Sequence, residues 1–178
     1  KSRAAAGETI INATIGVLLH ADGSLAIMPS VAETFKSMSA ATNAAYAPIA
    51  GKPEYRQAVI DDLLGELGLS HKAAAVATPG GTGALRMALD NFVDHGQTVI
   101  TSSYFWGPYR TLADESGHKL ATFNMFNAAG RLDVDDLDRV LGDCVAEQGC
   151  ALVILNTPCH NPTGYSMDQG EWDQVVEV

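Results

Sequence analysis

The stretch Ala151-Leu-Val-Ile-Leu-Asn156 decides the fold class, because its residues follow one another with almost no polar side chain between them. An apolar run of this length without polar alternation is typical of a strand that is covered on both faces, as in a parallel sheet between two layers of helices. Asn156 then opens a loop, Asn156-Thr-Pro-Cys-His-Asn-Pro-Thr-Gly164, at the carboxyl end of this strand.

The chain before this stretch alternates short apolar runs with helical patterns, which is the signature of an α/β protein. Three more strands are expected, at residues 74–78, 98–102 and 119–123. Helices are expected at residues 29–41, 52–67, 83–92, 108–116, 134–145 and 168–178. The sequence therefore predicts a mostly parallel sheet between helices.

Composition and charge exclude several classes of partner. The 178 residues are 47% hydrophobic and 18% charged, and the net charge is −10. Because no run of lysine and arginine is present to neutralise phosphates, we expect neither a nucleic acid nor a membrane surface as a partner. No apolar run approaches the roughly 18 residues of a membrane span. Three cysteines (Cys144, Cys150 and Cys159) form no C-x-x-C pair, which favours a reducing, cytoplasmic location.

A glycine-rich segment, Thr78-Pro-Gly-Gly-Thr-Gly-Ala-Leu-Arg86, lies where an expected strand passes into an expected helix. Glycines let a ligand approach the backbone, and the free N–H groups at the start of a helix attract an anion such as phosphate. The spacing matches neither the nucleoside triphosphate loop nor the dinucleotide fingerprint. Taken alone, the segment is equally compatible with a turn that binds nothing.

Two further loops follow expected strands and therefore lie at the edge where α/β sheets collect ligands. Tyr104-Phe-Trp-Gly-Pro-Tyr109 offers aromatic faces for a flat ligand, although burial in the core is the common fate of such residues. In the loop from Asn156 to Gly164, Asn161 precedes Pro162, which favours an extended backbone and a fixed direction for its amide. An ordinary loop closure is the alternative here.

These segments together resemble fold-type I aminotransferases, in the aspartate and aromatic amino acid branch of class I. The resemblance is carried by Asn12-Ala-Thr-Ile-Gly16, Tyr46-Ala-Pro-Ile-Ala-Gly51, the glycine-rich segment and Cys159-His-Asn-Pro-Thr-Gly164, all in the family's order. It implies the large-domain fold of the pyridoxal-5′-phosphate (PLP) dependent transferases, incomplete in this chain. Residues 1–45 would then be an N-terminal arm and first helix belonging to the small domain, and residues 46–178 the first part of the large domain.

The resemblance also implies roles for individual residues. Gly81 and Thr82 would hold the PLP phosphate, Trp106 would stack on the pyridine ring, and Asn161 would donate to the phenolic oxygen. For the stacking role, Tyr104 and Phe105 remain alternatives to Trp106.

Two more residues are assigned by the resemblance in the same way. Tyr46 would reach the phosphate of the cofactor in a partner subunit, which implies a homodimer. Gly16 would lie near the α-carboxylate of the substrate. His160 is expected to be structural.

The activity that the resemblance implies is transfer of an amino group between an L-amino acid, aromatic or dicarboxylic, and a 2-oxo acid. The family's Schiff-base lysine, its aspartate at the pyridine nitrogen and its substrate-binding arginines would all lie beyond residue 178, and the lysines present match no such motif. We therefore expect no catalytic residue within this chain, and no activity from the 178 residues alone.

Other functions compete with transamination. A C–S lyase or a decarboxylase of the same fold type would share the phosphate loop and the asparagine. A PLP-binding regulatory domain would carry a basic DNA-binding segment, and nothing before Gly16 is of that kind. A nucleophilic pair of Cys159 and His160 is disfavoured, because neighbours in an extended loop point to opposite sides.

Overall fold

The computed structural model describes residues 3, 6–7, 9 and 16–178, which divide into two compact units, Lys1–Pro48 and Ile49–Val178. The first unit contains helices α2 (Pro29–Ser37) and α3 (Ala40–Ala44) and an isolated antiparallel bridge between Leu19 and Leu25. Residues 12–15 of the motif that ends at Gly16 lie outside the described residues. The assignment of residues 1–45 to a small domain stays a prediction.

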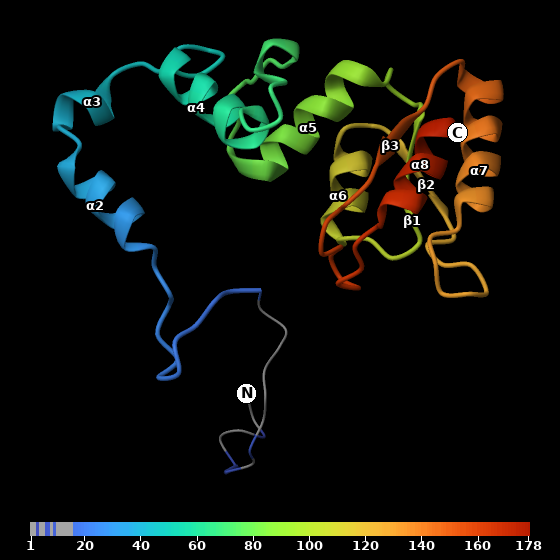
Figure 1. The fold of residues 1–178 in the computed structure, drawn as a ribbon, viewed down its shortest axis with the longest axis horizontal. Coiled ribbons are helices and arrows are strands. Elements are labelled where there is room, and N and C mark those ends of the chain that lie inside the picture. Colours follow the sequence, from blue (N-terminus) through green and yellow to red (C-terminus); the bar gives the residue numbers. More distant parts are fainter. Residues whose placement is uncertain (1–2, 4–5, 8, 10–15) are drawn as a thin grey trace. The chain divides into compact units, whose positions relative to one another are not determined.

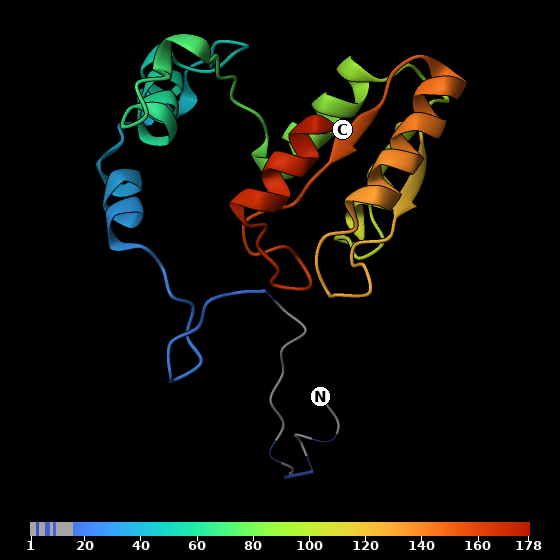
Figure 2. The same ribbon diagram turned by 45° about the vertical axis from the view of Figure 1, so that its right-hand side comes forward.

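The second unit contains a parallel three-stranded sheet in the order β2-β1-β3 (Figures 1 and 2). Its central strand β1 (Thr98–Ser102) pairs with β2 (Lys119–Phe123), with Val99 opposite Leu120, and with β3 (Leu152–Ile154), with Val99 opposite Leu152. The expected parallel sheet is thereby confirmed.

Six helices accompany the sheet in this unit. They are α4 (Pro53–Leu64), the short 3-10 helix η1 (Ser70–Lys72), α5 (Gly80–Phe92), α6 (Pro108–Glu115), α7 (Val134–Gln148) and α8 (Gln169–Glu177). Among the residues that the structure describes, no helix is long and apolar enough to cross a membrane.

Alternate strand residues point to opposite faces of the sheet, and each face has its own core. On one face, Val99 packs with Leu89 from α5, with Val93 just after this helix, and with Leu112 from α6. On the other face, Ile100 belongs to a cluster with residues of α7, and Val175 of α8 packs against it. Because both faces are covered, the strands can be apolar throughout, as in the stretch from Ala151 to Leu155.

One expected strand is wrong, since residues 74–78 form no strand in the structure. A strand needs a neighbouring ladder of hydrogen bonds. Among the described residues, this segment has a bond from the Ala77 N–H to the Ala50 carbonyl oxygen (3.0 Å) but no paired strand. The segment is apolar, as a buried strand would be, but its composition does not determine whether another strand lies beside it.

The expected helix at 29–41 is divided in the structure. Met38 takes an extended backbone after α2, and Ser39 then caps α3 by accepting a hydrogen bond on Oγ from the Thr42 N–H (3.0 Å). A serine that caps a new helix can end the preceding one, because the cap residue itself is non-helical.

Candidate functional site

The glycines at the start of α5 differ in what they allow. Gly80 has φ of +68°, a left-handed conformation that side chains disfavour. A Cβ on Gly83 would lie 2.7 Å from Cδ of Pro79, so this glycine permits a tight turn. A Cβ on Gly81 would meet nothing within 4 Å, so the space beside it is open. The expected helix at 83–92 thus begins earlier, with the glycines inside its first turn.

This first turn presents hydrogen-bond donors to the outside. The N–H groups of Gly81 and Thr82 lie in the first turn, where an α-helix offers them no internal acceptor. Gly81 and Thr82 are exposed, and Thr82 adds a hydroxyl. Such a group of donors at a helix start suits a phosphate or another anion.

The loop after β1 holds an aromatic cluster. Tyr109 is 5% exposed and lies in the first turn of α6. Its ring lies parallel to that of Phe105 (centroids 6.4 Å apart) and edge-on to that of Trp106 (5.8 Å, 84°). Trp106 itself is half-buried. The cluster fixes the turn that carries Trp106.

The loop after β3 is tied to this cluster by the side chain of Asn156. The Asn156 Nδ2 group donates to the Tyr109 hydroxyl (3.2 Å), and the Asn156 Oδ1 accepts from the Asn161 N–H (3.2 Å). Asn161 is exposed, so its own amide is available to a ligand. The peptide bond that precedes Pro162 is cis.

His160 anchors the same loop from its other side. The ring is 4% exposed, with Nδ1 at 2.9 Å from Oγ1 of Thr163 and Nε2 at 3.3 Å from Oγ of Ser102. Burial lowers the pKa of His160, against a smaller opposing effect of the Tyr104 backbone. Its ring contacts hold the loop, as expected of a structural histidine.

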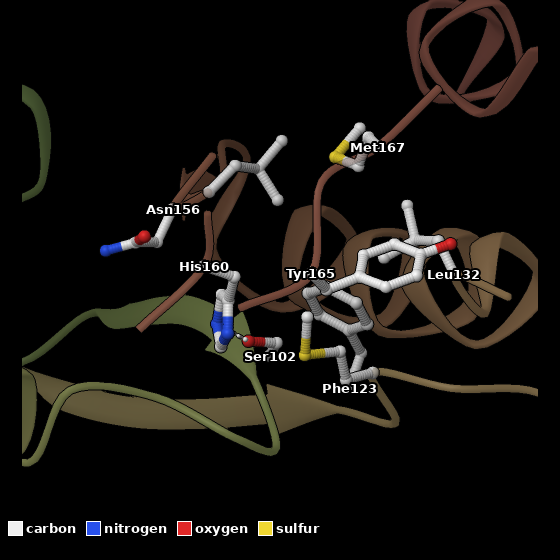
Figure 3. Close-up of a pocket in the computed structure, with 9 residues that line it drawn as sticks. Ser102, Phe123, Leu132, Asn156, His160, Tyr165 and Met167 are labelled. Carbon is white, nitrogen blue, oxygen red and sulfur yellow. Dashed lines mark hydrogen bonds between the residues drawn. The ribbon is translucent and has the colours of Figure 1, made fainter. Parts of the chain in front are cut away.

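A small pocket lies beneath this loop (Figure 3). In Figure 3, His160 faces Ser102 inside the pocket, whereas the Asn156 amide points away from Tyr165 and Leu132. The lining is mainly apolar and is made by Ser102, Phe123, Met125, Leu132, Leu155, Asn156, His160, Tyr165 and Met167.

A buried carboxylate, Glu171, fixes the far end of the loop. It accepts hydrogen bonds from the Leu132 N–H (2.8 Å), the Tyr165 hydroxyl (2.5 Å) and the Asp168 N–H (3.0 Å), and Arg131 lies 3.2 Å away. Burial by itself raises the pKa of Glu171, but these hydrogen bonds and the guanidinium outweigh it and leave the pKa lowered. Glu171 is therefore a charged support of the loop.

The structure brings two of the expected site residues, Trp106 and Asn161, into one network through Tyr109 and Asn156. The start of α5 lies at the end of the sheet where β3 terminates, as both ribbon views show (Figures 1 and 2). Tyr46 and Gly16 belong to the first unit and are exposed, Tyr46 fully so.

Reasoning from the sequence missed Asn156 and Tyr109 as parts of the site. Asn156 stood in the quoted stretch as the last residue of a strand, and Tyr109 as one aromatic among several. A polar residue directly after a buried strand was the available signal, because the carboxyl ends of parallel strands meet at one edge. The partners of that side chain could not be read from the sequence.

Comparison with known proteins gives a family match over residues 8–178, to the class I and II aminotransferases. An aromatic-amino-acid aminotransferase of Paracoccus denitrificans is 30% identical over 94% of this chain and 43% of the relative. An aspartate aminotransferase of Pseudomonas aeruginosa is 29% identical with the same coverage of both chains. The chain thus spans less than half of the length of these relatives.

Solved structures give the same result. An aminotransferase from Anaerococcus prevotii superposes with a TM-score of 0.87 at 36% identity, over 94% of this chain and 41% of that one. An aromatic-amino-acid aminotransferase from Burkholderia pseudomallei, described as covalently bound to pyridoxal phosphate, gives a TM-score of 0.74 at 25% identity, over 99% of this chain and 46% of that one. The fold expected from the resemblance is confirmed.

Proposed function

The chain belongs to the class I and II aminotransferase family, and from this premise we propose that the full-length protein is a PLP-dependent aminotransferase. It would move an amino group between an L-amino acid, aromatic or dicarboxylic, and a 2-oxo acid. Relatives named for aromatic amino acids and for aspartate are about equally similar to the chain, so both substrate classes belong to the proposal.

The observation that carries this proposal is the open first turn of α5. A phosphate can approach the Gly81 backbone without meeting a side chain, and the N–H groups and the Thr82 hydroxyl are donors suited to it. The helix dipole adds about 0.3–1 kcal/mol in an exposed setting. Local donors of this kind are needed because the chain as a whole, with a net charge of −10, repels anions.

The remaining donors fit the rest of the cofactor. Trp106 would stack on the pyridine ring, and the exposed Asn161 amide would donate to the phenolic oxygen. Tyr104 and Phe105 are less suited to stacking. The ring of Tyr104 contacts that of Phe126 (6.0 Å), and the ring of Phe105 contacts both the Tyr109 ring (6.4 Å) and the Arg110 guanidinium (5.8 Å). When bound, PLP supplies an electron sink, while the protein supplies binding and orientation.

Two proposed contacts depend on a dimer. The ring of Tyr46 is fully exposed and is therefore free to reach a cofactor phosphate in a partner subunit. Gly16, also exposed, would lie near the substrate α-carboxylate. We propose a homodimer with sites that combine residues of both subunits.

The test is purification of the full-length protein, a visible absorption spectrum, and incubation with L-tyrosine or L-aspartate and a dicarboxylic 2-oxo acid. We expect bound PLP and transfer of the amino group to the 2-oxo acid. Release of carbon dioxide as the main product would establish a decarboxylase instead. In a parallel incubation with a thioether amino acid such as L-cystathionine, release of a thiol as the main product would establish a C–S lyase. Absence of PLP binding would refute the proposal.

The 178-residue chain alone is expected to be inactive, because its lysines match no Schiff-base motif. The same assay on this chain tests the expectation, and appreciable turnover would contradict it.

A further inference from the structure

Asn156 lies where the two loops of the candidate site meet. Its side chain has one donor group and one acceptor group, and each is used on a different loop. The donor contacts the Tyr109 hydroxyl, and the acceptor takes the Asn161 N–H, both at 3.2 Å. Asn156 itself lies two residues after the end of β3 and is half-buried.

The partner on the donor side is rigid. Tyr109 is 5% exposed and is held between the rings of Phe105 and Trp106 at the start of α6. The amide of Asn156 is planar, so a hydrogen bond from its Nδ2 group to a fixed hydroxyl also fixes the position of its Oδ1. The position of the Asn161 backbone is therefore fixed relative to the turn that carries Trp106.

We propose that Asn156 is a positioning residue of the site: it sets the Asn161 backbone relative to the Trp106 turn, so that the amide donor and the stacking ring act on one cofactor. The inference rests on the proposed function, since Asn161 and Trp106 are ligands only if PLP binds. His160 holds the same loop from the pocket side, through Ser102. Asn156 differs from His160 because it connects the loop to the second ligand-bearing segment.

The experiment uses the full-length protein with the variants Asn156→Leu, Asn161→Ala and the double variant. Hydrogen–deuterium exchange without PLP, resolved to the Asn161 N–H within the segment 156–164, reports this contact. We expect exchange there to be roughly tenfold faster in Asn156→Leu. With PLP added, the pKa read from the visible absorption band should shift in Asn156→Leu in the same direction as in Asn161→Ala. The double variant should match Asn161→Ala, because both act through one contact.

Asn127→Leu is the matched control. The Asn127 Oδ1 also holds a loop, by accepting from the N–H groups of Ala129 (2.9 Å) and Arg131 (3.1 Å), but it touches neither Trp106 nor Asn161. It should leave the absorption pKa unchanged. If Asn156→Leu does not fold, Tyr109→Phe removes the donor-side partner alone and should shift the band in the same direction, by less.

Two outcomes overturn the inference while leaving the proposed function intact. One is a wild-type absorption pKa in Asn156→Leu, or in Tyr109→Phe where that variant replaces it, although Asn161→Ala shifts it. The other is a double variant whose shift is the sum of the single shifts. If wild-type protein binds no PLP, the proposed function itself fails, and the inference fails with it.

Discussion

At the scale of single residues, the glycines of the α5 start show how one motif contains separate requirements. Gly80 adopts a positive φ angle, and Gly83 allows close packing against Pro79. Gly81 leaves open space beside the backbone, where a side chain would otherwise lie. The sequence could indicate a candidate phosphate site here, because glycines at a helix start are a local signal, and the resemblance to the family then favoured it over a turn that binds nothing. It could not separate the three roles, since φ angles and the position of Pro79 depend on the folded turn.

These roles predict different effects of the same substitution. Gly80→Ala should lower the free energy of unfolding by about 1 kcal/mol, because alanine is strained at positive φ. Gly81→Ala should leave it unchanged or slightly raised, because alanine favours the helix and its Cβ meets no atom. Urea unfolding of both variants of the full-length protein is the measurement. Equal losses in the two variants would contradict the distinction.

Gly81→Ala is expected to act on binding instead. Its methyl group would occupy the space through which a phosphate reaches the backbone, so the affinity for PLP should fall although the fold is unchanged. Titration of the apoprotein with PLP, followed by absorbance, compares this variant with the wild type. An unchanged dissociation constant would count against Gly81 as a phosphate ligand.

Glu171 predicts a dependence of stability on pH. Its pKa is lowered in the folded protein, so the stabilisation is complete above the ordinary glutamate pKa of about 4.3 and is lost as the pH falls through the lower, folded value. Glu171→Gln should cost about 2 kcal/mol at pH 7, because hydrogen bonds to a buried charge are lost.

The difference between wild type and Glu171→Gln should decrease as the pH falls below that range. Thermal unfolding at several pH values checks this, with Gln169→Leu, at an exposed position of the same helix, as the control. A difference that stays constant down to pH 3 would show that the charge of Glu171 is not what stabilises the loop.

At the scale of elements, the end of α7 provides the hydrogen-bond partners that a neighbouring strand would provide for the start of β1. The side chain of Gln148 accepts from the Thr98 N–H (2.8 Å) and donates to the Thr98 carbonyl oxygen (3.0 Å), so the first residue of β1 is paired by an amide. The strand at 98–102 was predictable from its apolar run. The failed strand at 74–78 has a similar run but no such partner, and the sequence does not distinguish the two cases.

Gln148→Leu is expected to lower the free energy of unfolding by about 1–3 kcal/mol, because it leaves backbone groups of Thr98 without partners. Gln169→Leu is the control, since the Gln169 amide donates to Asp173 on an exposed helix surface (2.8 Å) and should cost less than about 0.5 kcal/mol. Chemical denaturation of the two variants gives the comparison. If both variants lower the free energy of unfolding by similar, small amounts, the idea that Gln148 completes the sheet is refuted.

At the scale of the whole molecule, the motifs and their order along the chain were enough to predict the family. The contact between the Trp106 turn and the Asn161 loop was not predictable, since it depends on how β1 and β3 pair. The first unit illustrates the same limit: the role proposed for Tyr46 requires a second chain, and one chain shows only that its ring is exposed.

A mixing experiment decides whether Tyr46 acts across subunits. Full-length Tyr46→Phe and Asn161→Ala should each be strongly impaired. If Tyr46 serves the partner's site, a hybrid dimer has one site with both residues intact and one with neither. Random mixing of equal amounts makes half of the dimers hybrids, so activity should recover to about a quarter of the wild-type value. If Tyr46 serves its own subunit, every hybrid site still lacks one residue, and the mixture stays at the mean of the two variants.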